Sequence, residues 1–199
     1  TSSNVAVTCS AGALTLADTK TMTSGGTTTL SAQSIASVAY TVASAGAVAV
    51  TGPWTATGAL SVTSSGSTIT LNDDITTGGT AKDLTINANG ALALATNADA
   101  LTASGVLTVS ASTATSGAAT LTSTGNMAVT LTDKWLATSG NLALLSSAAL
   151  NLDGNLETAT TGDVTLTVTA ACMFADGKSL ISVAAATVNC ASSTAVGYT

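Results

Sequence analysis

The chain has 199 residues, of which 7% are charged, against roughly 25% in an average soluble domain. It contains four lysines and ten carboxylates, but no arginine and no histidine. Most acid–base, metal and phosphate chemistry therefore lacks its usual residues. The net charge of −6 excludes a basic surface for nucleic acid.

Short runs of alternating apolar and small polar residues follow one another along the chain, each beginning at a glycine. These runs are GALTL at Gly12, GTTTL at Gly26, GAVAV at Gly46, GALSV at Gly58, GALAL at Gly90, GVLTV at Gly105, GAATL at Gly117, GNLAL at Gly140 and GDVTL at Gly162. Alternation over a few residues, punctuated by Gly, Asn, Asp and Ser, predicts strands joined by tight turns.

The predicted strands recur in three interleaved series with steps of about 21 to 25 residues, a period typical of solenoids. The first series is centred near Thr15, Tyr40, Ser61, Thr85, Thr108, Val129, Asn151 and Cys172. The second passes through Val7, Thr29, Ala49, Thr70, Ala93, Thr120, Ala143, Thr167 and Val188. The third passes through Thr55, Ile75, Leu101, Trp135, Leu156 and Leu180.

Three short strands per repeat describe one coil of a parallel β-helix. We predict an all-β solenoid that forms a single domain over residues 1–199, with about nine coils of roughly 22 residues. The single proline, Pro53, agrees with strands that need their N–H groups for pairing. An antiparallel β-sandwich is the alternative, because it also has a turn every 8 to 12 residues, roughly.

The segment GNLALLSSAALNLDGNLETATTGDVTLTV, residues 140–168, resembles the repeats of filamentous-haemagglutinin-type proteins and autotransporter passengers. The resemblance covers most of the chain through its G-x-L-x-L pattern. It implies a right-handed β-helix that is secreted to the bacterial cell surface and acts as an adhesin or fibre.

The second series predicts inward residues at alternate positions, so that the residues between them point outward. Thr-x-Thr then alternates with Ala-x-Ala up one flat, uncharged face. Its threonines are Thr27, Thr29, Thr68, Thr70, Thr120, Thr122, Thr165 and Thr167. Such a face suits plain solvent exposure or packing against a neighbouring rod, and it also resembles the threonine rows of β-solenoid antifreeze proteins.

Three cysteines are candidates for a contact between subunits. Cys9 and Cys190 fall at equivalent places of the second series in the first and last coils, and Cys172 lies 18 residues before Cys190. An odd cysteine count in a secreted chain indicates a bond between chains or a free thiol. One hypothesis joins Cys9 of one subunit to Cys172 or Cys190 of the next. The other is an internal Cys172–Cys190 bridge with Cys9 buried.

No constellation of catalytic residues stands out, and we expect neither an enzyme nor a cofactor or metal. The lysines lie close in sequence to aspartates, which predicts local charge pairing at corners. The run from Asp153 to Glu157 offers oxygens for Ca²⁺, but a solvated turn is the simpler interpretation.

Trp54 and Trp135 are expected in the core or at corners. The apolar stretch over 35–50 is interrupted by Ser and Thr and lacks flanking Lys or Arg, so no membrane span is expected.

No capping helix is predicted at either end, and open solenoid ends favour head-to-tail stacking. We therefore predict a structural subunit of a secreted, extracellular or cell-surface filament whose partner is itself, as a homopolymer whose rods also bundle. The alternative is an adhesin module that binds ice or a polysaccharide through the flat threonine face.

Overall fold

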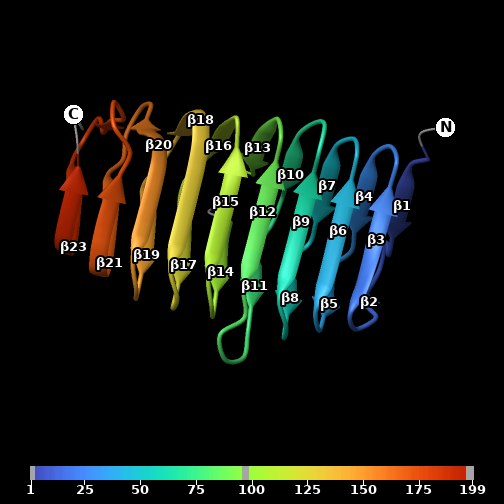
Figure 1. Cartoon of the computed structure of the whole chain (residues 1–199). Helices are drawn as coiled ribbons and strands as arrows, with labels where there is room; N and C mark the ends of the chain where they lie inside the picture. The colour runs from blue at the N-terminus through green and yellow to red at the C-terminus, as the bar shows by residue number, and fades with distance from the viewer. Residues whose placement is uncertain (1–2, 96–98, 196–199) are drawn as a thin grey trace.

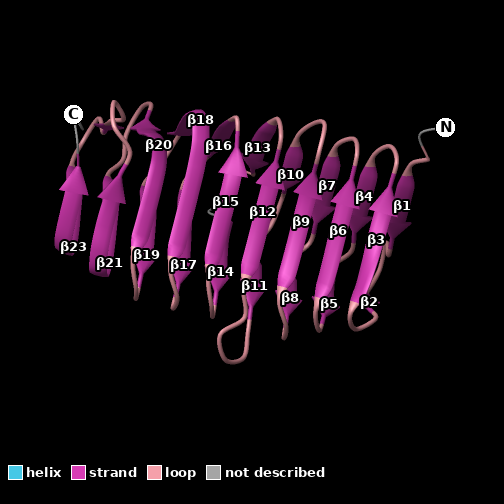
Figure 2. Ribbon diagram, viewed as in Figure 1, coloured by secondary structure: helices cyan, strands magenta, loops and turns pink. Residues whose placement is uncertain are grey.

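The computed structural model describes residues 3–95 and 99–195, and this part of the chain consists of strands and turns without a helix (Figures 1 and 2). Each strand pairs in parallel with the strand one turn further along the chain. In Figure 1 the nearer strands point upward while the chain advances from right to left, so the coil is right-handed. The fold is a right-handed parallel β-helix of about nine turns. This confirms the predicted class and excludes the sandwich.

Three parallel sheets surround one interior, and each is named here by its first strand. The β1 sheet contains β1 (Val5–Thr8), β4 (Thr28–Ser31), β7 (Val48–Thr51), β10 (Ile69–Leu71), β13 (Ala91–Leu94), β16 (Thr113–Ser116) and β22 (Leu180–Ile181). The β2 sheet contains β2 (Ala13–Leu16), β5 (Ser34–Ser37), β8 (Trp54–Ala56), β11 (Ile75–Thr77), β14 (Asp99–Ala103), β17 (Ala119–Ser123) and β19 (Leu142–Ser146). The β3 sheet contains β3 (Lys20–Ser24), β6 (Tyr40–Ser44), β9 (Leu60–Ser64), β12 (Leu84–Ala88) and β15 (Leu107–Ala111).

Four longer strands bend at a corner and contribute to two sheets each. They are β18 (Met127–Ala137) and β20 (Leu150–Thr158), which pass from the β3 sheet into the β1 sheet, and β21 (Val164–Phe174) and β23 (Ala186–Ala195), which pass from the β2 sheet into the β3 sheet. The run from Asp153 to Glu157 lies inside β20, so the turn expected there is wrong. The pairing of β20 with β18 is irregular at this corner, where the register shifts between Thr130 and Lys134.

The interior is built from columns of apolar side chains, one per turn. The predicted inward residues are all buried: Leu30, Val48, Val50, Ile69, Leu71, Leu92, Leu94, Leu121, Leu142, Leu144, Val164 and Leu166. In the β2 sheet one column runs through Ile35, Trp54, Ile75, Leu101, Leu121, Leu144 and Leu166. Each turn thus covers the apolar layer of the turn before it, which is how a repeat that lacks a core of its own becomes stable.

Two buried tryptophans are held by a recurring polar contact. The indole Nε1 of Trp54 donates to Ser37 Oγ at 3.0 Å, and Nε1 of Trp135 donates to Ser116 Oγ at 3.0 Å. Both serines lie on the preceding turn and are themselves buried. The prediction that the two tryptophans belong to the core is confirmed, because neither is more than 1% exposed.

Polar side chains at the corners join one turn to the next. Oδ1 of Asn4 accepts a hydrogen bond from the backbone N–H of Thr27 at 2.9 Å, and Oδ1 of Asp83 accepts one from Val106 at 2.9 Å. The same arrangement links Asp74 to Ala100, Asn141 to Asp163 and Asp163 to Ala185. These side chains satisfy backbone donors at corners where the strand ladder is interrupted.

Both the backbone conformation and the surroundings require glycine at position 52. Gly52 has a φ of +102°, and a Cβ placed on it would overlap the carbonyl oxygen of Ala32 on the preceding turn. By contrast, a Cβ on Gly78 would lie 3.9 Å from its nearest neighbour, the carbonyl oxygen of Ala56. Close stacking of turns therefore demands glycine at some corners and tolerates other residues elsewhere.

The three predicted series do not each follow one sheet. The second series runs along the β1 sheet as far as Ala93 and then passes to the β2 sheet at Thr120. The third series moves the opposite way, from Leu101 in the β2 sheet to Trp135 in the β1 sheet. The first series follows the β3 sheet except for Thr15, which belongs to the β2 sheet. The period was predicted correctly, but the sheet to which each strand belongs was not.

Candidate functional site

The threonines predicted to form one flat face are divided between two sheets. Thr29 and Thr70 lie on the β1 sheet, with Thr27 and Thr68 directly before their strands. The other four belong to the β2 sheet: Thr120 and Thr122 in β17, and Thr165 and Thr167 in β21. The prediction that all eight threonines share one face is therefore wrong, because the second series passes from the β1 sheet to the β2 sheet.

The alternation of threonine and alanine is nevertheless present on the β1 sheet. Its outward column reads Ala6, Thr29, Ala49, Thr70, Ala93 and Thr115. The pair Thr113 and Thr115 continues the pattern in place of Thr120 and Thr122, and the sequence analysis missed it. A step of 22 residues from Ala93 to Thr115 was the available signal. The column then ends at Leu136 and Glu157.

The β3 sheet carries an outward column of hydroxyl groups that the sequence analysis also missed. It runs over consecutive turns through Thr21, Thr41, Ser61, Thr85 and Thr108. The adjacent outward column contains Thr23, Ala43, Thr63, Asn87 and Ser110. Neither column contains a charge, and neighbouring turns place their hydroxyls about 4.8 Å apart. The β2 sheet has a similar outward run over four turns, Thr55, Thr76, Thr102 and Thr122.

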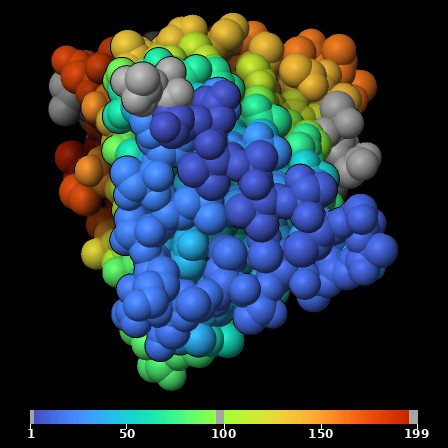
Figure 3. All heavy atoms as spheres, turned by 90° about the vertical axis from the view of Figure 1, so that its right-hand side faces the viewer, coloured from blue at the N-terminus to red at the C-terminus, as the bar shows by residue number. Residues whose placement is uncertain are grey.

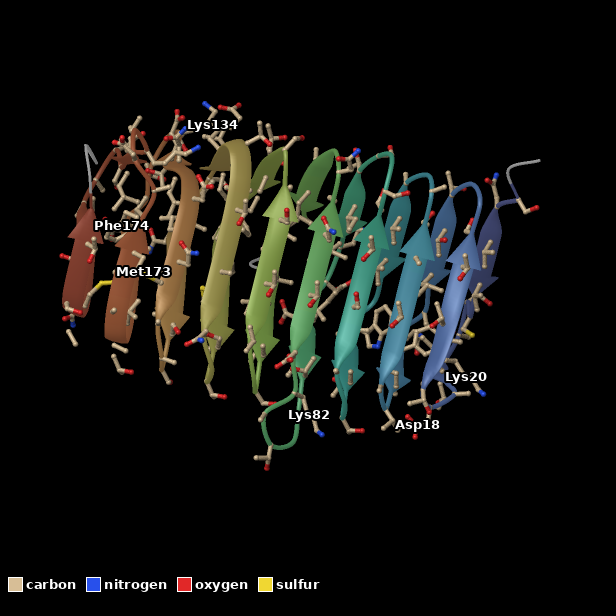
Figure 4. All side chains as sticks on the ribbon, in the orientation of Figure 1. Asp18, Lys20, Lys82, Lys134, Met173 and Phe174 are labelled. Carbon is tan, nitrogen blue, oxygen red and sulfur yellow. A yellow bond between two sulfur atoms is a disulfide. The ribbon has the colours of Figure 1, made fainter. Side chains whose placement is uncertain are left out.

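The two ion pairs join residues of different turns, not residues that are neighbours in the sequence. Nζ of Lys134 lies 2.7 Å from Oε2 of Glu157, and Nζ of Lys178 lies 3.4 Å from Oδ1 of Asp153. The expected local pairing of Lys134 with Asp133 is thus replaced by a pair one turn away. The hydrogen bond from Lys134 to Glu157 raises the pKa of this lysine above its ordinary value. Figure 4 shows Lys134 at the upper edge of the rod.

The cysteines are arranged differently from the proposed contact between subunits. Cys172 and Cys190 form a disulfide within the chain, with their Cα atoms 6.0 Å apart, and Cys9 is free and half-buried. Cys9 follows β1, whereas Cys190 lies in the part of β23 that belongs to the β2 sheet. The two are not at equivalent positions, so the sequence-based alignment of Cys9 with Cys190 is wrong, and the internal bridge is the pairing present.

At the N-terminal end of the rod, apolar side chains of the first turn are only partly covered. Val7, Cys9, Leu14 and Met22 pack against the core but are half-buried. Figure 3 looks onto this end, where atoms of the first turns form a broad surface. No further turn of the described chain lies beyond them, so one edge of each sheet is also unpaired here.

The last turns expose apolar side chains at the other end. Val188 lies in the interior column after Leu166 but is 45% exposed. Leu180 and Phe174 are only partly buried, and Figure 4 shows Phe174 and Met173 near the end of the rod. Other large apolar residues are also exposed in these turns: Met173, Ile181 and Val183. Both ends thus combine unpaired strand edges with apolar side chains.

No cluster of metal-ligating side chains emerges from the described residues. They contain no group of three or more Cys, Asp or Glu side chains placed to hold a metal ion. Two shallow hollows lie beside Lys20 and Tyr40 and beside Ser24 and Ser44. Within the same part of the chain, no helix has the length and apolar character to cross a membrane. The open ends and the hydroxyl columns are therefore the surfaces with a distinct chemical character.

Comparison with known proteins found no match to this chain among family models, curated proteins or solved structures.

Proposed function

We propose that the protein is a structural subunit of an extracellular or cell-surface filament that grows by stacking rods head to tail. The observation that carries the proposal is the pair of apolar, unpaired ends. Exposed strand edges are surfaces on which further strands readily pair. A contact between two different ends of one molecule is heterologous, and when it does not close into a ring it generates a filament.

The strand register makes the two ends complementary to each other. If the first turn of one copy continues the last turn of another, the interior columns bring Leu14 onto Val188. The same continuation places Leu16 onto Cys190 and Val5 onto Leu180. Apolar residues would meet apolar residues in these columns, and the parallel edges would supply matching N–H and C=O groups.

The disulfide supports an extracellular location. Disulfides persist in oxidising compartments and are rare in the cytosol of most organisms. The Cys172–Cys190 bond therefore favours a secreted subunit. Weak surface charge also favours assembly, since neighbouring rods would repel one another little.

Electron microscopy of the concentrated, oxidised protein tests this proposal. We expect fibres with an axial repeat of about 40 Å, which is nine turns of roughly 4.8 Å. A monodisperse monomer at the highest attainable concentration would refute the proposal.

Two matched substitutions locate the contact. Val188→Asp places a charge in the stacking surface, whereas Val38→Asp makes the same change at a side chain that is also 45% exposed but lies in the second turn. We expect Val188→Asp to abolish fibres and Val38→Asp to retain them, with circular dichroism confirming that both variants fold. Fibres formed equally by both would show that this end does not take part.

The second candidate is an adhesin module that binds ice or a polysaccharide, and the hydroxyl column of the β3 sheet favours it. The column supplies regularly spaced donors and acceptors on a flat surface. Thr85→Tyr would place a bulky ring at its centre. We expect this variant to lose thermal hysteresis or glycan binding if the column is a binding surface. Thr70→Tyr on the β1 sheet, whose neighbours in the outward column are Ala49 and Ala93, should keep the activity. Absence of both activities in the wild type would exclude this candidate.

A further inference from the structure

We infer that the Cys172–Cys190 disulfide is a redox-sensitive lock that holds the last turn in the form required for stacking. The inference rests on the proposed function, since it concerns the C-terminal stacking surface. Cys172 is fully buried in the part of β21 that belongs to the β3 sheet. Cys190 is half-buried in the part of β23 that belongs to the β2 sheet. The bond thus ties the inner sides of two sheets together.

The last turn is held from one side: β23 pairs with β21, and hydrogen bonds join Ser182 and Val183 to the preceding turn, but within the described residues nothing packs against its other side. Its strands pair with a neighbouring turn on one side only, and β22 has two residues. Val188 and Leu180 contact the core from one side and are incompletely buried. Segments with little buried apolar surface open locally at low free-energy cost. The covalent link therefore adds a restraint on the side of the last turn that no described residue covers.

The bond is placed where a reductant can reach it. Cys190 is partly exposed at the open end, whereas Cys172 lies behind it and is 0% exposed. A thiolate of a small dithiol would attack the sulfur of Cys190, and the sulfur of Cys172 would leave as a thiolate and take up a proton. The second thiol of the reductant would then close a cyclic disulfide and release Cys190 as a thiol. Two electrons pass from the dithiol to the protein disulfide.

Reduction removes the restraint between Cys172 and Cys190, which lie 18 residues apart in the sequence. The segment that carries Leu180 and Val188 lies between the two cysteines, and both residues contribute to the stacking surface. When the segment opens, the column that would receive Leu14 of the next copy is lost. The oxidised and reduced proteins should therefore differ at the C-terminal end and match elsewhere.

Hydrogen exchange of the wild-type monomer, with and without dithiothreitol, measures the lock directly. We expect reduction to accelerate amide exchange in β22 and β23 by at least about tenfold and to leave β9 and β12 unchanged. The Cys172→Ala/Cys190→Ala variant should reproduce the reduced pattern, and Cys9→Ser should reproduce the oxidised one. If the double variant does not fold, reduction of the wild type still decides the result. Equal exchange in β22 and β23 before and after reduction would overturn the lock.

An assembly measurement separates this inference from the proposed function. Oxidised subunits should elongate filament seeds, and reduced subunits should elongate them at least about tenfold more slowly. If exchange responds to reduction but oxidised protein never forms filaments, the proposed function fails while the lock on the last turn stands. If filaments form equally fast from both states, control of stacking by the disulfide is refuted.

Discussion

Thr28 provides a sharp test of the packing described above. Its side chain points into the interior between Val5 and Val48 and is 1% exposed. Its Oγ1 is the buried side-chain oxygen without a hydrogen-bond partner among the described residues. A buried hydroxyl that has lost its water without gaining a partner costs about 1–3 kcal/mol. Thr28→Val removes this cost, because a methyl group of similar size replaces the hydroxyl and the branched β-carbon is kept.

We expect Thr28→Val to raise the free energy of unfolding by about 1–2 kcal/mol, since most of the desolvation cost disappears and the new methyl group is buried. In a chain of this length, each kcal/mol shifts the melting temperature by about 2–4 °C. The variant should therefore melt about 2–8 °C higher, a shift that calorimetry or circular dichroism resolves.

The matched control is Thr29→Val, which makes the same chemical change at the next residue. Thr29 points outward and is half-exposed, so its hydroxyl is free to bond with water. We expect the control to change the free energy of unfolding by less than about 0.5 kcal/mol. If Thr28→Val is neutral or destabilising relative to this control, the Thr28 hydroxyl is not an unsatisfied group, and the reasoning is refuted.

Three further substitutions test other contacts. Ser37→Ala should cost about 1–3 kcal/mol in urea denaturation, because it leaves the buried indole N–H of Trp54 without an acceptor; an equal cost in a Trp54→Phe background would contradict this. Gly52→Ala should destabilise by about 2–4 kcal/mol, whereas Gly78→Ala, where a Cβ has space, should have little effect. Lys134→Met should destabilise slightly at neutral pH and low salt. Since the folded pKa of the lysine is raised, the difference should vanish as the pH rises above that pKa, or when salt is added.

The division between inside and outside was predictable from the sequence, whereas the assignment of strands to sheets was not. Alternation alone decides whether Leu92 or Val164 faces the core, because neighbouring residues of a strand point to opposite sides. All three sheets show this same alternation, so it does not distinguish between them. The steps are also unequal: 21 residues separate Thr55 from its partner Thr76, but 26 separate Thr76 from Thr102. The longer step lets a series with a fixed period move to another sheet.

Contacts between turns could not be predicted from the sequence either, because the two residues of each contact are separated by a whole repeat. Lys134 has Asp133 beside it in the chain but pairs with Glu157. Cys172 had two possible partners on spacing alone, and only the structure, which brings β21 and β23 together, selects Cys190. The open ends were predictable in part, since the sequence showed no capping helix. The prediction that they carry head-to-tail assembly stays untested.

The register between neighbouring turns has a consequence for the length of the molecule. The hydrogen bonds at the corners lie within one turn or, as from Thr27 to Asn4, join adjacent turns, so these contacts do not depend on how many turns the rod contains. Val42 and Val62 occupy the same position of successive turns. Removing the chain from one of these to the other would excise a complete layer and shorten the rod by about 4.8 Å. The number of repeats therefore sets the length of the rod, which can change by whole turns while both ends keep their structure.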